Sequence, residues 1–397
     1  MVPWRPEVRP PSVLCCRAIR CAGWLPPVRA SDSIVSTHVN VRLTDRDAAV
    51  VRPKEPYSAV DGHGQPSNGA ESSAIGFNIS VDTEEDNWEP TTGNSTTQNI
   101  REIPRLQRLL ERLGARTTLF VSYQVASDPT AAAIMREAVA SNSIEVGAHL
   151  HPWNTPPVEG REEQCSMLWQ YPRDSQGKKI ARLKEILREN IGVEATAFRA
   201  GRFGVGTDTL GALEDTGFRV DSSVTPLLSW REYGGPSFVR APLHVYRPSA
   251  VDLCAPTSDG KLVEVPLTTG FTRFGRSHWR TLAKSLYGPL GQRMHLPGLL
   301  NQALDLRRVI LSPETDIVSD MLAASRRIID EGGRHLHMYF HSNSLVPGLT
   351  PFVRTTKDLE LMYSSIERYF EGLSAFARII PRTVSEEAEA FEHQTAA

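Results

Sequence analysis

From Ala74 onward the chain alternates between short apolar runs with the period of a strand and longer segments with the period of a helix. In the first run, Ile75, Phe77, Ile79 and Val81 alternate with small or polar residues, which predicts a strand. Strands that alternate with helices predict a parallel sheet, and right-handed crossovers limit how that sheet closes. With about seven or eight strand–helix units, the pattern favours a closed or nearly closed (β/α) barrel over an open doubly wound sheet.

The other predicted elements follow in the same alternation. We predict strands at 117–122, 144–151, 195–199, 218–221, 262–267 and 335–341. We predict helices at 103–113, 129–140, 175–189, 207–216, 312–331 and 358–377, and a weakly marked helical stretch at 280–308. Asp128 before Pro129 is a typical N-cap and first helical residue. Residues 74–390 are therefore predicted to form one (β/α) barrel domain.

Residues 1–73 differ in composition, because they are rich in Pro, Arg, Ser and Gly and show no lasting apolar period. We interpret them as a disordered or mis-assigned N-terminal tail. They contain no apolar core of a signal peptide, and no run in the chain reaches the ~18 apolar residues of a membrane span. The five cysteines form no C-x-x-C pair, which favours a reduced compartment, and a cytoplasmic protein is the expectation.

The net charge of the chain is −2, which argues against a general nucleic-acid-binding protein. The sequence does not indicate an oligomeric state.

Two histidines close the third predicted strand. His149 and His151 are separated by one residue, and Pro152 ends the strand because it cannot donate to a sheet. Residues i and i+2 of a strand point to the same side, so both imidazoles project together from its end. This arrangement provides two of the ligands that a metal site needs; alternatively, the two histidines are polar residues that cap the strand.

The first and last predicted strands also end in ionisable residues. Asp82 and Glu84 share a face at the carboxyl end of the first strand, where one can serve as a general base and the other as a metal ligand. We interpret Glu85, Asp86 and Glu89 as an acidic loop. His341 ends the last strand and suits a general acid near neutral pH. The earlier histidines of that strand, His335 and His337, are interpreted as structural.

A further stretch, 198–206, follows a strand and precedes a helix. It lacks the third glycine of a dinucleotide-binding loop, which argues against a nicotinamide cofactor. Arg199 at the strand end can instead hold a carboxylate by a bidentate contact. The chain contains no G-x-S-x-G elbow, P-loop or H-E-x-x-H motif.

Together and in this order, these stretches resemble the polysaccharide deacetylase (NodB-homology) family of carbohydrate esterases, and its WalW-like branch in particular. The motifs are Ser-Val-Asp-Thr-Glu-Glu-Asp, Glu-Val-Gly-Ala-His-Leu-His-Pro-Trp, Phe-Arg-Ala-Gly-Arg-Phe-Gly, Val-Asp-Ser-Ser and Met-Tyr-Phe-His-Ser. The resemblance implies a distorted (β/α) barrel with about seven parallel strands. It implies metal-dependent hydrolysis of an N- or O-linked acetyl group on a glycan.

The resemblance also implies residue roles. Asp82 is the base, His341 the acid, Arg199 the residue that orients Asp82, and Asp221 a support of that network. Glu84, His149 and His151 are the implied ligands of a divalent metal. Zinc suits such a mixed imidazole and carboxylate site, and cobalt or nickel would also fit.

Three residues are candidates for the acetylated glycan substrate. Trp153 can stack on a sugar, Arg202 can meet an anionic group, and a backbone N–H near Phe203 and Gly204 can stabilise an oxyanion. The chain departs from the common family pattern, in which the acids are adjacent aspartates and the histidines lie four apart. Two alternatives stay open: a metal-independent hydrolase of a non-peptide C–N bond on the same fold, and a glycan-binding pseudoenzyme.

Overall fold

The computed structural model describes residues 74–87, 95–160, 162 and 165–396. The predicted N-terminal tail, residues 1–73, and Glu89 of the predicted acidic loop lie outside the described residues. Among the described residues, no helix has the length and apolar composition that crossing a membrane requires.

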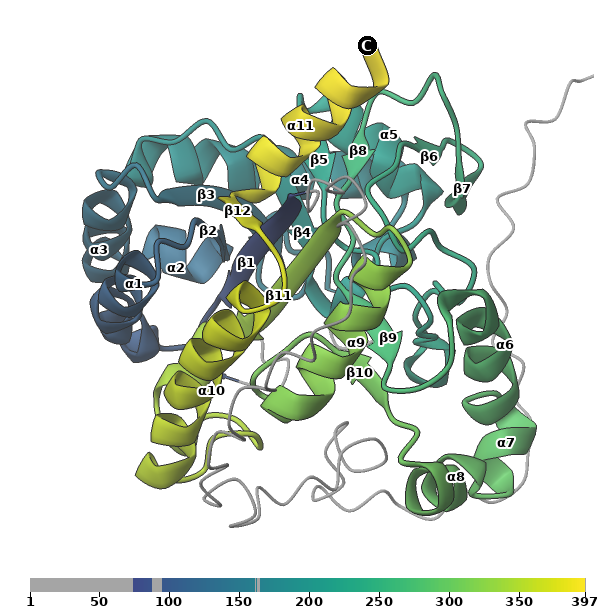
Figure 1. The fold of residues 1–397 in the computed structure, drawn as a ribbon. Helices are drawn as coiled ribbons and strands as arrows, with labels where there is room; N and C mark the ends of the chain where they lie inside the picture. Colours follow the sequence, from purple (N-terminus) through teal and green to yellow (C-terminus); the bar gives the residue numbers. More distant parts are fainter. Residues whose placement is uncertain (1–73, 88–94, 161, 163–164, 397) are drawn as a thin grey trace, which may run out of the picture. The chain divides into compact units, whose positions relative to one another are not determined.

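Parallel strands form the centre of the fold (Figure 1). Seven of them follow one another in the order β11-β1-β2-β3-β4-β5-β8, and β12 pairs in parallel with the first half of β1. Their bounds are β1 Ile75–Thr83, β2 Thr117–Val121, β3 Ile144–Leu150, β4 Ala197–Ala200, β5 Val220–Asp221, β8 Val263–Glu264, β11 His335–His341 and β12 Ile379–Arg382. Two short antiparallel pairs, β6 (Pro248–Ser249) with β7 (Asp252–Pro256) and β9 (Thr269–Phe271) with β10 (Arg308–Ile310), lie outside this sheet.

The two outer strands of the sheet, β8 and β11, are joined by a few backbone hydrogen bonds rather than by a regular ladder. Thr268, which follows β8, donates its N–H to the carbonyl of His337 at 3.2 Å. Leu311 donates to the carbonyl of Thr268 and accepts from Tyr339, at 2.9 and 3.0 Å. The predicted distorted (β/α) barrel with seven parallel strands is confirmed.

The helices of the described residues are α1 Ile103–Arg112, α2 Tyr123–Ser127, α3 Pro129–Val139, α4 Arg173–Ile186, α5 Thr207–Asp215, α6 Arg276–Leu286, α7 Pro289–Arg293, α8 Leu296–Leu304, α9 Val318–Asp330, α10 Thr356–Ser374 and α11 Val384–Ala396. The helices α6, α7 and α8 lie to one side of the sheet and α11 packs at the amino ends of its strands, whereas the other helices surround the sheet (Figure 1). The apolar residues of β1 face them; Phe77, for example, lies 5.9 Å from the rings of Tyr369 and Phe370 on α10. Asp128 caps α3 by accepting from the N–H groups of Thr130 and Ala131, as predicted.

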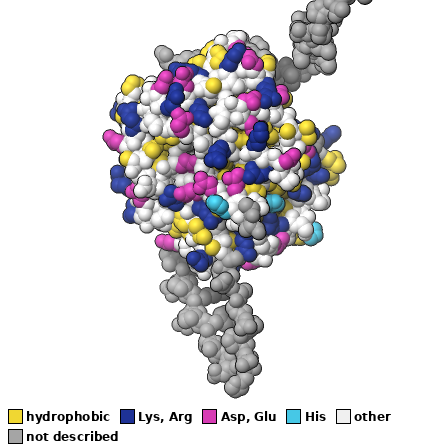
Figure 2. Space-filling model, turned by 90° about the horizontal axis from the view of Figure 1, so that it is seen from above, with side chains coloured by type: hydrophobic (Ala, Val, Ile, Leu, Met, Phe, Trp, Pro, Cys, Tyr) yellow, Lys and Arg dark blue, Asp and Glu magenta, His cyan; other side chains and the backbone are white. Residues whose placement is uncertain are grey.

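The two ends of the barrel differ in polarity. A separate apolar cluster joins β2, β4, β5 and β8 to Val384 and Ala388 of α11, which directly follows β12 and lies near the beginning of β1 (Figure 1). The carboxyl ends of the strands instead carry the ionisable residues described below. Seen from above, the surface shows Lys and Arg interspersed with Asp and Glu (Figure 2). Since α11 covers the amino ends of the strands, we expect a functional site at their carboxyl ends.

The structure departs from the predicted secondary structure at the start of one helix and in elements that were not predicted. Residues 312–317 form turns rather than the start of a helix, and α9 begins only at Val318. The reason is tertiary: Glu314 is held by the backbone and ring of His341. The strand β12 and the helix α11 were not predicted, and α2 was missed before α3.

Candidate active site

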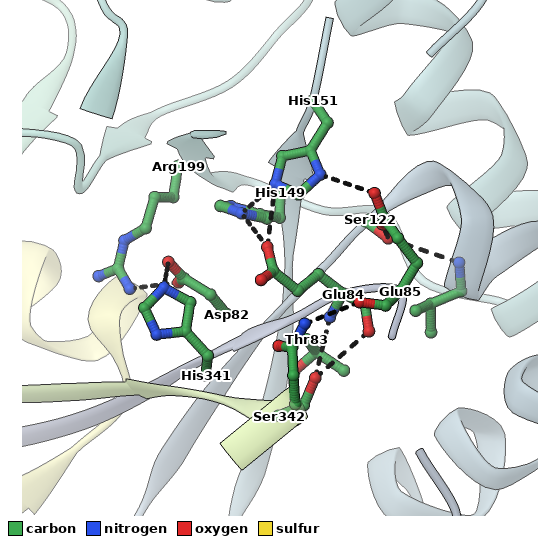
Figure 3. A network of polar contacts seen from close by, with 12 residues as sticks. Asp82, Thr83, Glu84, Glu85, Ser122, His149, His151, Arg199, His341 and Ser342 are labelled. Atoms are coloured by element: carbon green, nitrogen blue, oxygen red, sulfur yellow. Dashed lines mark hydrogen bonds and ion pairs between the residues drawn. The ribbon is translucent and has the colours of Figure 1, made fainter. Parts of the chain in front are cut away.

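Glu84, His149 and His151 converge on one point at the carboxyl ends of β1 and β3 (Figure 3). The Oε2 atom of Glu84 lies 3.3 Å from Nε2 of His149 and 2.9 Å from Nε2 of His151, and the two Nε2 atoms are 3.0 Å apart. All three residues are buried, at 6%, 2% and 5% exposure. Within the described residues, this is the one group of three or more metal-ligating side chains that come so close together.

This triangle fits a divalent metal. Ligand atoms about 2.0–2.2 Å from a tetrahedral zinc lie about 3.3 Å or slightly more from one another. The three observed separations are close to that value, and the donor set of two imidazoles and one carboxylate is typical of catalytic zinc. The residues present therefore suit the metal that the sequence predicted.

Glu85 fixes the orientation of His151 from the other side of its ring. Its Oε1 atom lies 3.0 Å from Nδ1 of His151, and Oε2 accepts from the hydroxyl of Ser122 at 3.0 Å. Asn154 also donates to this carboxylate. A carboxylate behind a ligating histidine sets its tautomer and raises its basicity. The interpretation of Glu85 as a residue of an acidic loop was wrong, because its side chain is only 2% exposed and belongs to the site.

The turn after His151 is held by a buried lysine of α4. Lys179 donates to the carbonyls of Pro152, Thr155 and Pro157 at 3.0, 2.8 and 2.6 Å. Burial lowers the pKa of this ammonium group below its usual value, although the nearby carboxylate of Glu162 partly opposes that effect. Three carbonyls on one cation keep this turn compact, which places His151 over the end of β1.

Asp82 lies beside the triangle and is bound by Arg199 of β4. Oδ1 of Asp82 accepts from Nη1 of Arg199 at 2.7 Å, and both residues are buried. Arg199 also donates to the carbonyl and hydroxyl of Ser222 at 2.8 and 2.9 Å. Burial favours the protonated form of Asp82, but Arg199 and nearby imidazoles lower its pKa below the usual value. Asp82 is therefore held as an anion that can accept a proton.

His341 faces Asp82 from the end of β11 (Figure 3). Its Nε2 atom lies 4.0 Å from Oδ2 of Asp82, and its Nδ1 atom lies 2.9 Å from Oε2 of Glu314. Burial favours the neutral ring, but Glu314, together with Glu84 and Asp82, outweighs burial, and the pKa of His341 rises to about 9. The ring is thus a cation at neutral pH, with Nε2 directed toward Asp82 and able to donate.

Asp221 and Glu264 form a buried pair behind Arg199. Among the described residues, Arg199 makes no hydrogen bond or ion pair with Asp221; the link runs through Ser222, the next residue. The hydroxyl of Ser223 donates to Asp221, and Glu264 accepts from the N–H of Val224 at 3.0 Å. Burial of both carboxyl groups against each other raises the pKa of each. The contacts of Asp221 with Ser223 and of Glu264 with Val224 hold the 222–224 backbone that supports Arg199.

Aromatic and cationic side chains line one side of the site. Trp153 stacks on His151 at 4.3 Å, and the guanidinium of Arg202 lies 5.4 Å from the centre of the Trp153 ring. Phe203 stacks on Trp230 at 5.3 Å. Arg202 and Phe203 both have positive φ, at 55° and 54°, a strained conformation that is concentrated at functional sites. Gly201 before them allows the approach of His151, since a Cβ there would lie 2.4 Å from the ring.

The structure thus brings together Asp82, Glu84, His149, His151, Arg199 and His341, all of which the sequence indicated. It adds two residues that the sequence analysis did not assign to the site, Glu85 and Glu314. His335 and His337 are buried lower in the barrel and contact the carbonyl of Pro266 and the hydroxyl of Ser80, in keeping with structural roles. Gly204 donates its N–H to Gly201, which leaves the amide of Phe203 as the candidate oxyanion donor.

Comparisons with known proteins found solved structures of low similarity to this chain. No protein-family model and no curated protein matches the chain. A Mycobacterium smegmatis structure assigned as a polysaccharide deacetylase has a TM-score of 0.45 and 16% identity, covering 81% of this chain and 92% of its own. The family 4 carbohydrate esterase of Streptomyces lividans has a TM-score of 0.36 and 10% identity, with 78% and 91% covered. The 4-alpha-glucanotransferase of Thermococcus litoralis has a TM-score of 0.42 and 13% identity, with 80% and 40% covered.

These similar structures include proteins of the kind that the sequence motifs resemble, together with an enzyme of another activity. Fold alone does not assign a reaction. The function proposed below is therefore argued from the side chains of the site, and membership of the WalW-like branch stays a prediction.

Proposed function

We propose that this protein is a metal-dependent hydrolase that removes an N- or O-linked acetyl group from a glycan. The observation that carries the proposal is one arrangement: a buried triangle of Glu84, His149 and His151 lies beside an anionic Asp82 and a cationic His341. A hydrolase that splits an ester or amide needs a base, an acid and an electrophilic group within reach of one carbonyl. A protein that only binds a glycan does not need a base, an acid and an electrophilic group side by side.

Glu84, His149 and His151 would hold the metal, with Glu85 orienting His151 through Nδ1. When bound, a divalent cation there polarises the acetyl carbonyl and lowers the pKa of a nearby water. Zinc is the proposed metal, because its coordination chemistry suits two imidazoles and one carboxylate; cobalt or nickel would also fit.

The protein's own residues would then perform the proton transfers. Asp82 accepts the proton of the water that attacks the acetyl carbon, and Arg199 keeps that carboxylate ionised and in place. The N–H of Phe203 is the proposed donor to the developing oxyanion. His341 gives its Nε2 proton to the departing nitrogen or oxygen. Glu314 holds the ring and favours its protonated form, so that His341 takes up a proton again before the next turnover.

Arg202 would contact the glycan beside the acetyl group and favour an anionic group on the substrate. Trp153, which was predicted to stack on a sugar, is only 6% exposed, with its ring stacked on His151 and beneath the guanidinium of Arg202; it would therefore hold these two residues in place instead of presenting a free face. Asp221 is proposed as a support of Arg199 through Ser222. A cytoplasmic location stays a prediction.

Metal content and acetate release test the proposal together. We expect about one divalent metal per purified chain, none in a His149→Ala/His151→Ala variant, and an unchanged content in a His278→Ala/His393→Ala control, whose two histidines are exposed. Release of acetate from acetylated oligosaccharides should occur only in the variants that retain the metal. Activity that survives complete removal of the metal would favour the metal-independent C–N hydrolase. Metal or glycan binding without any product would favour the pseudoenzyme.

A further inference from the structure

A lobe formed by residues 272–304, which contain α6, α7 and α8, has an unusual surface. Eight large hydrophobic side chains are exposed in the described structure, and five of them lie in this lobe. They are Phe274 (46%), Leu290 (71%), Met294 (55%), Leu299 (57%) and Leu304 (48%). A concentration of this kind marks an interaction surface, whereas single exposed hydrophobic residues are ordinary.

The helix α8 illustrates how little of the lobe is covered. Its sequence is Leu-Pro-Gly-Leu-Leu-Asn-Gln-Ala-Leu, and none of its nine residues is buried. A helix this short gains little stability by itself and normally depends on packing of its apolar face. By contrast, α6 is anchored by the fully buried Trp279, whose ring packs against Phe271. The lobe is therefore attached to the barrel mainly through α6; Leu296 and Leu300 of α8 are partly buried against the core, whereas Leu290, Leu299 and Leu304 remain exposed.

The lobe is also cationic, although the whole chain has a net charge of −2. No Asp or Glu occurs from residue 265 to residue 304. The lobe carries five permanent cations: Arg273, Arg276, Arg280, Lys284 and Arg293.

Two carboxylates from neighbouring segments reach this surface. Asp305 lies 3.7 Å from Arg273, and Glu331 accepts from the backbone N–H of Arg276. In the described part of the chain, Arg280, Lys284 and Arg293 have no carboxylate partner. A positive charge therefore remains beside the exposed leucines.

We propose that the 272–304 lobe docks this protein onto the surface of a lipid bilayer that contains anionic lipid. Exposed leucine, methionine and phenylalanine beside arginine and lysine is the composition of helices that lie in the plane of a membrane interface. The apolar side chains enter the boundary between headgroups and acyl chains, while the cations meet the negative headgroups. Two copies of the lobe in a symmetric contact would instead place like cations against each other.

Vesicle co-sedimentation of the full chain tests this proposal, independently of any enzymatic activity. The probes are vesicles of phosphatidylcholine alone and of phosphatidylcholine with phosphatidylglycerol. We expect binding to the second kind only, weakened by added salt. Each neutralised cation should weaken binding about fivefold, so Lys284→Gln/Arg293→Gln should weaken it roughly 25-fold. Leu290→Ser/Leu299→Ser should weaken it roughly tenfold or more.

Matched controls lie elsewhere on the surface. Lys261→Gln removes a cation whose side chain is 82% exposed, and Val251→Ser removes an apolar side chain that is 86% exposed; neither should change binding. Failure to bind the anionic vesicles, or binding that the lobe variants leave intact, would overturn the proposal. So would a lipid-free dimer that Leu290→Ser/Leu299→Ser dissociates, because that result would assign the face to a second copy.

Discussion

Glu314→Gln isolates the electrostatic control of the proposed acid. Glu314 is buried, with its side chain 1% exposed, and its carboxylate meets both the ring and the backbone N–H of His341. Glutamine has nearly the same size, so the substitution removes a charge while leaving an acceptor beside Nδ1. Burial by itself lowers the pKa of His341, and Glu314 is the largest influence that raises it to about 9. Asp82 and Glu84 also raise it and are unchanged in the variant.

Removing a charge in direct contact shifts a pKa by about 1–3. We expect a fall of about 2 for His341, equivalent to about 2.7 kcal/mol. The protonated ring is the active form of an acid, so activity is present below its pKa and is lost as pH rises through it. In the variant that loss should begin near neutral pH instead of near pH 9. At pH 8 only about one-tenth of the variant rings would be protonated, which predicts about a tenfold loss there and little loss at pH 6.

The measurement is the pH profile of kcat/KM for acetate release, with metal content held equal in both proteins. Histidine NMR of the same variant gives the pKa of His341 without reference to turnover. Glu367→Gln, on the exposed face of α10, is the control and should leave the profile in place. If His341 still titrates near its original pKa in Glu314→Gln, the role of Glu314 is refuted. If the pKa of His341 falls but the alkaline limb does not move, His341 is refuted as the acid.

Three further predictions concern the base, the orientation of a ligand and the turn that carries it. Asp82→Asn should lower turnover about 10²–10⁴-fold with metal content unchanged, measured by acetate release; near-normal turnover would remove Asp82 from the role of base. Glu85→Gln should weaken metal affinity about 10–100-fold in a chelator competition, because His151 loses the carboxylate behind its ring; an equal affinity would contradict this. Lys179→Met should leave three carbonyls without their donor, two of them in buried contacts, costing about 1–3 kcal/mol in the free energy of unfolding by denaturant and weakening metal binding as well; a stable protein with normal affinity would show that the turn does not depend on Lys179.

The parts of the site that the sequence predicted follow from local geometry. In a strand, side chains alternate between two faces, which places Asp82 opposite Phe77 and Ile79; continuing the same alternation by one residue beyond β1 predicts that Glu84 lies on the side of Asp82. Parallel strands also present their carboxyl ends at one end of a barrel. These two rules place residues from β1, β3, β4 and β11 near one another without knowledge of the packing. They are enough to bring Asp82, Arg199 and His341 into one neighbourhood.

Glu85 and Glu314 could not be placed in this way. Glu85 follows the end of β1, where alternation no longer fixes a direction, and only Ser122, Asn154 and His151 in the folded chain show that it points inward. Glu314 lies in Ser-Pro-Glu, a typical helix start, but its contacts with His341 hold it in a turn. Both are tertiary effects that override local preference. For α11 a signal did exist, since Val384, Ala388 and Phe391 have helical spacing and pack on one cluster.

The spacing of the two histidines shows why a departure from a family pattern need not remove a site. Two residues apart on a straight strand, successive side chains on one face lie about 6.6–6.8 Å apart and run side by side. Here the Nε2 atoms are 3.0 Å apart and the rings are inclined by 69°. The difference arises because β3 ends at Leu150, so His149 belongs to the strand and His151 to the turn. Lys179 fixes that turn through three carbonyls, and Gly201 leaves room for the ring. The convergence of the two imidazoles is therefore set by residues outside the His-x-His motif.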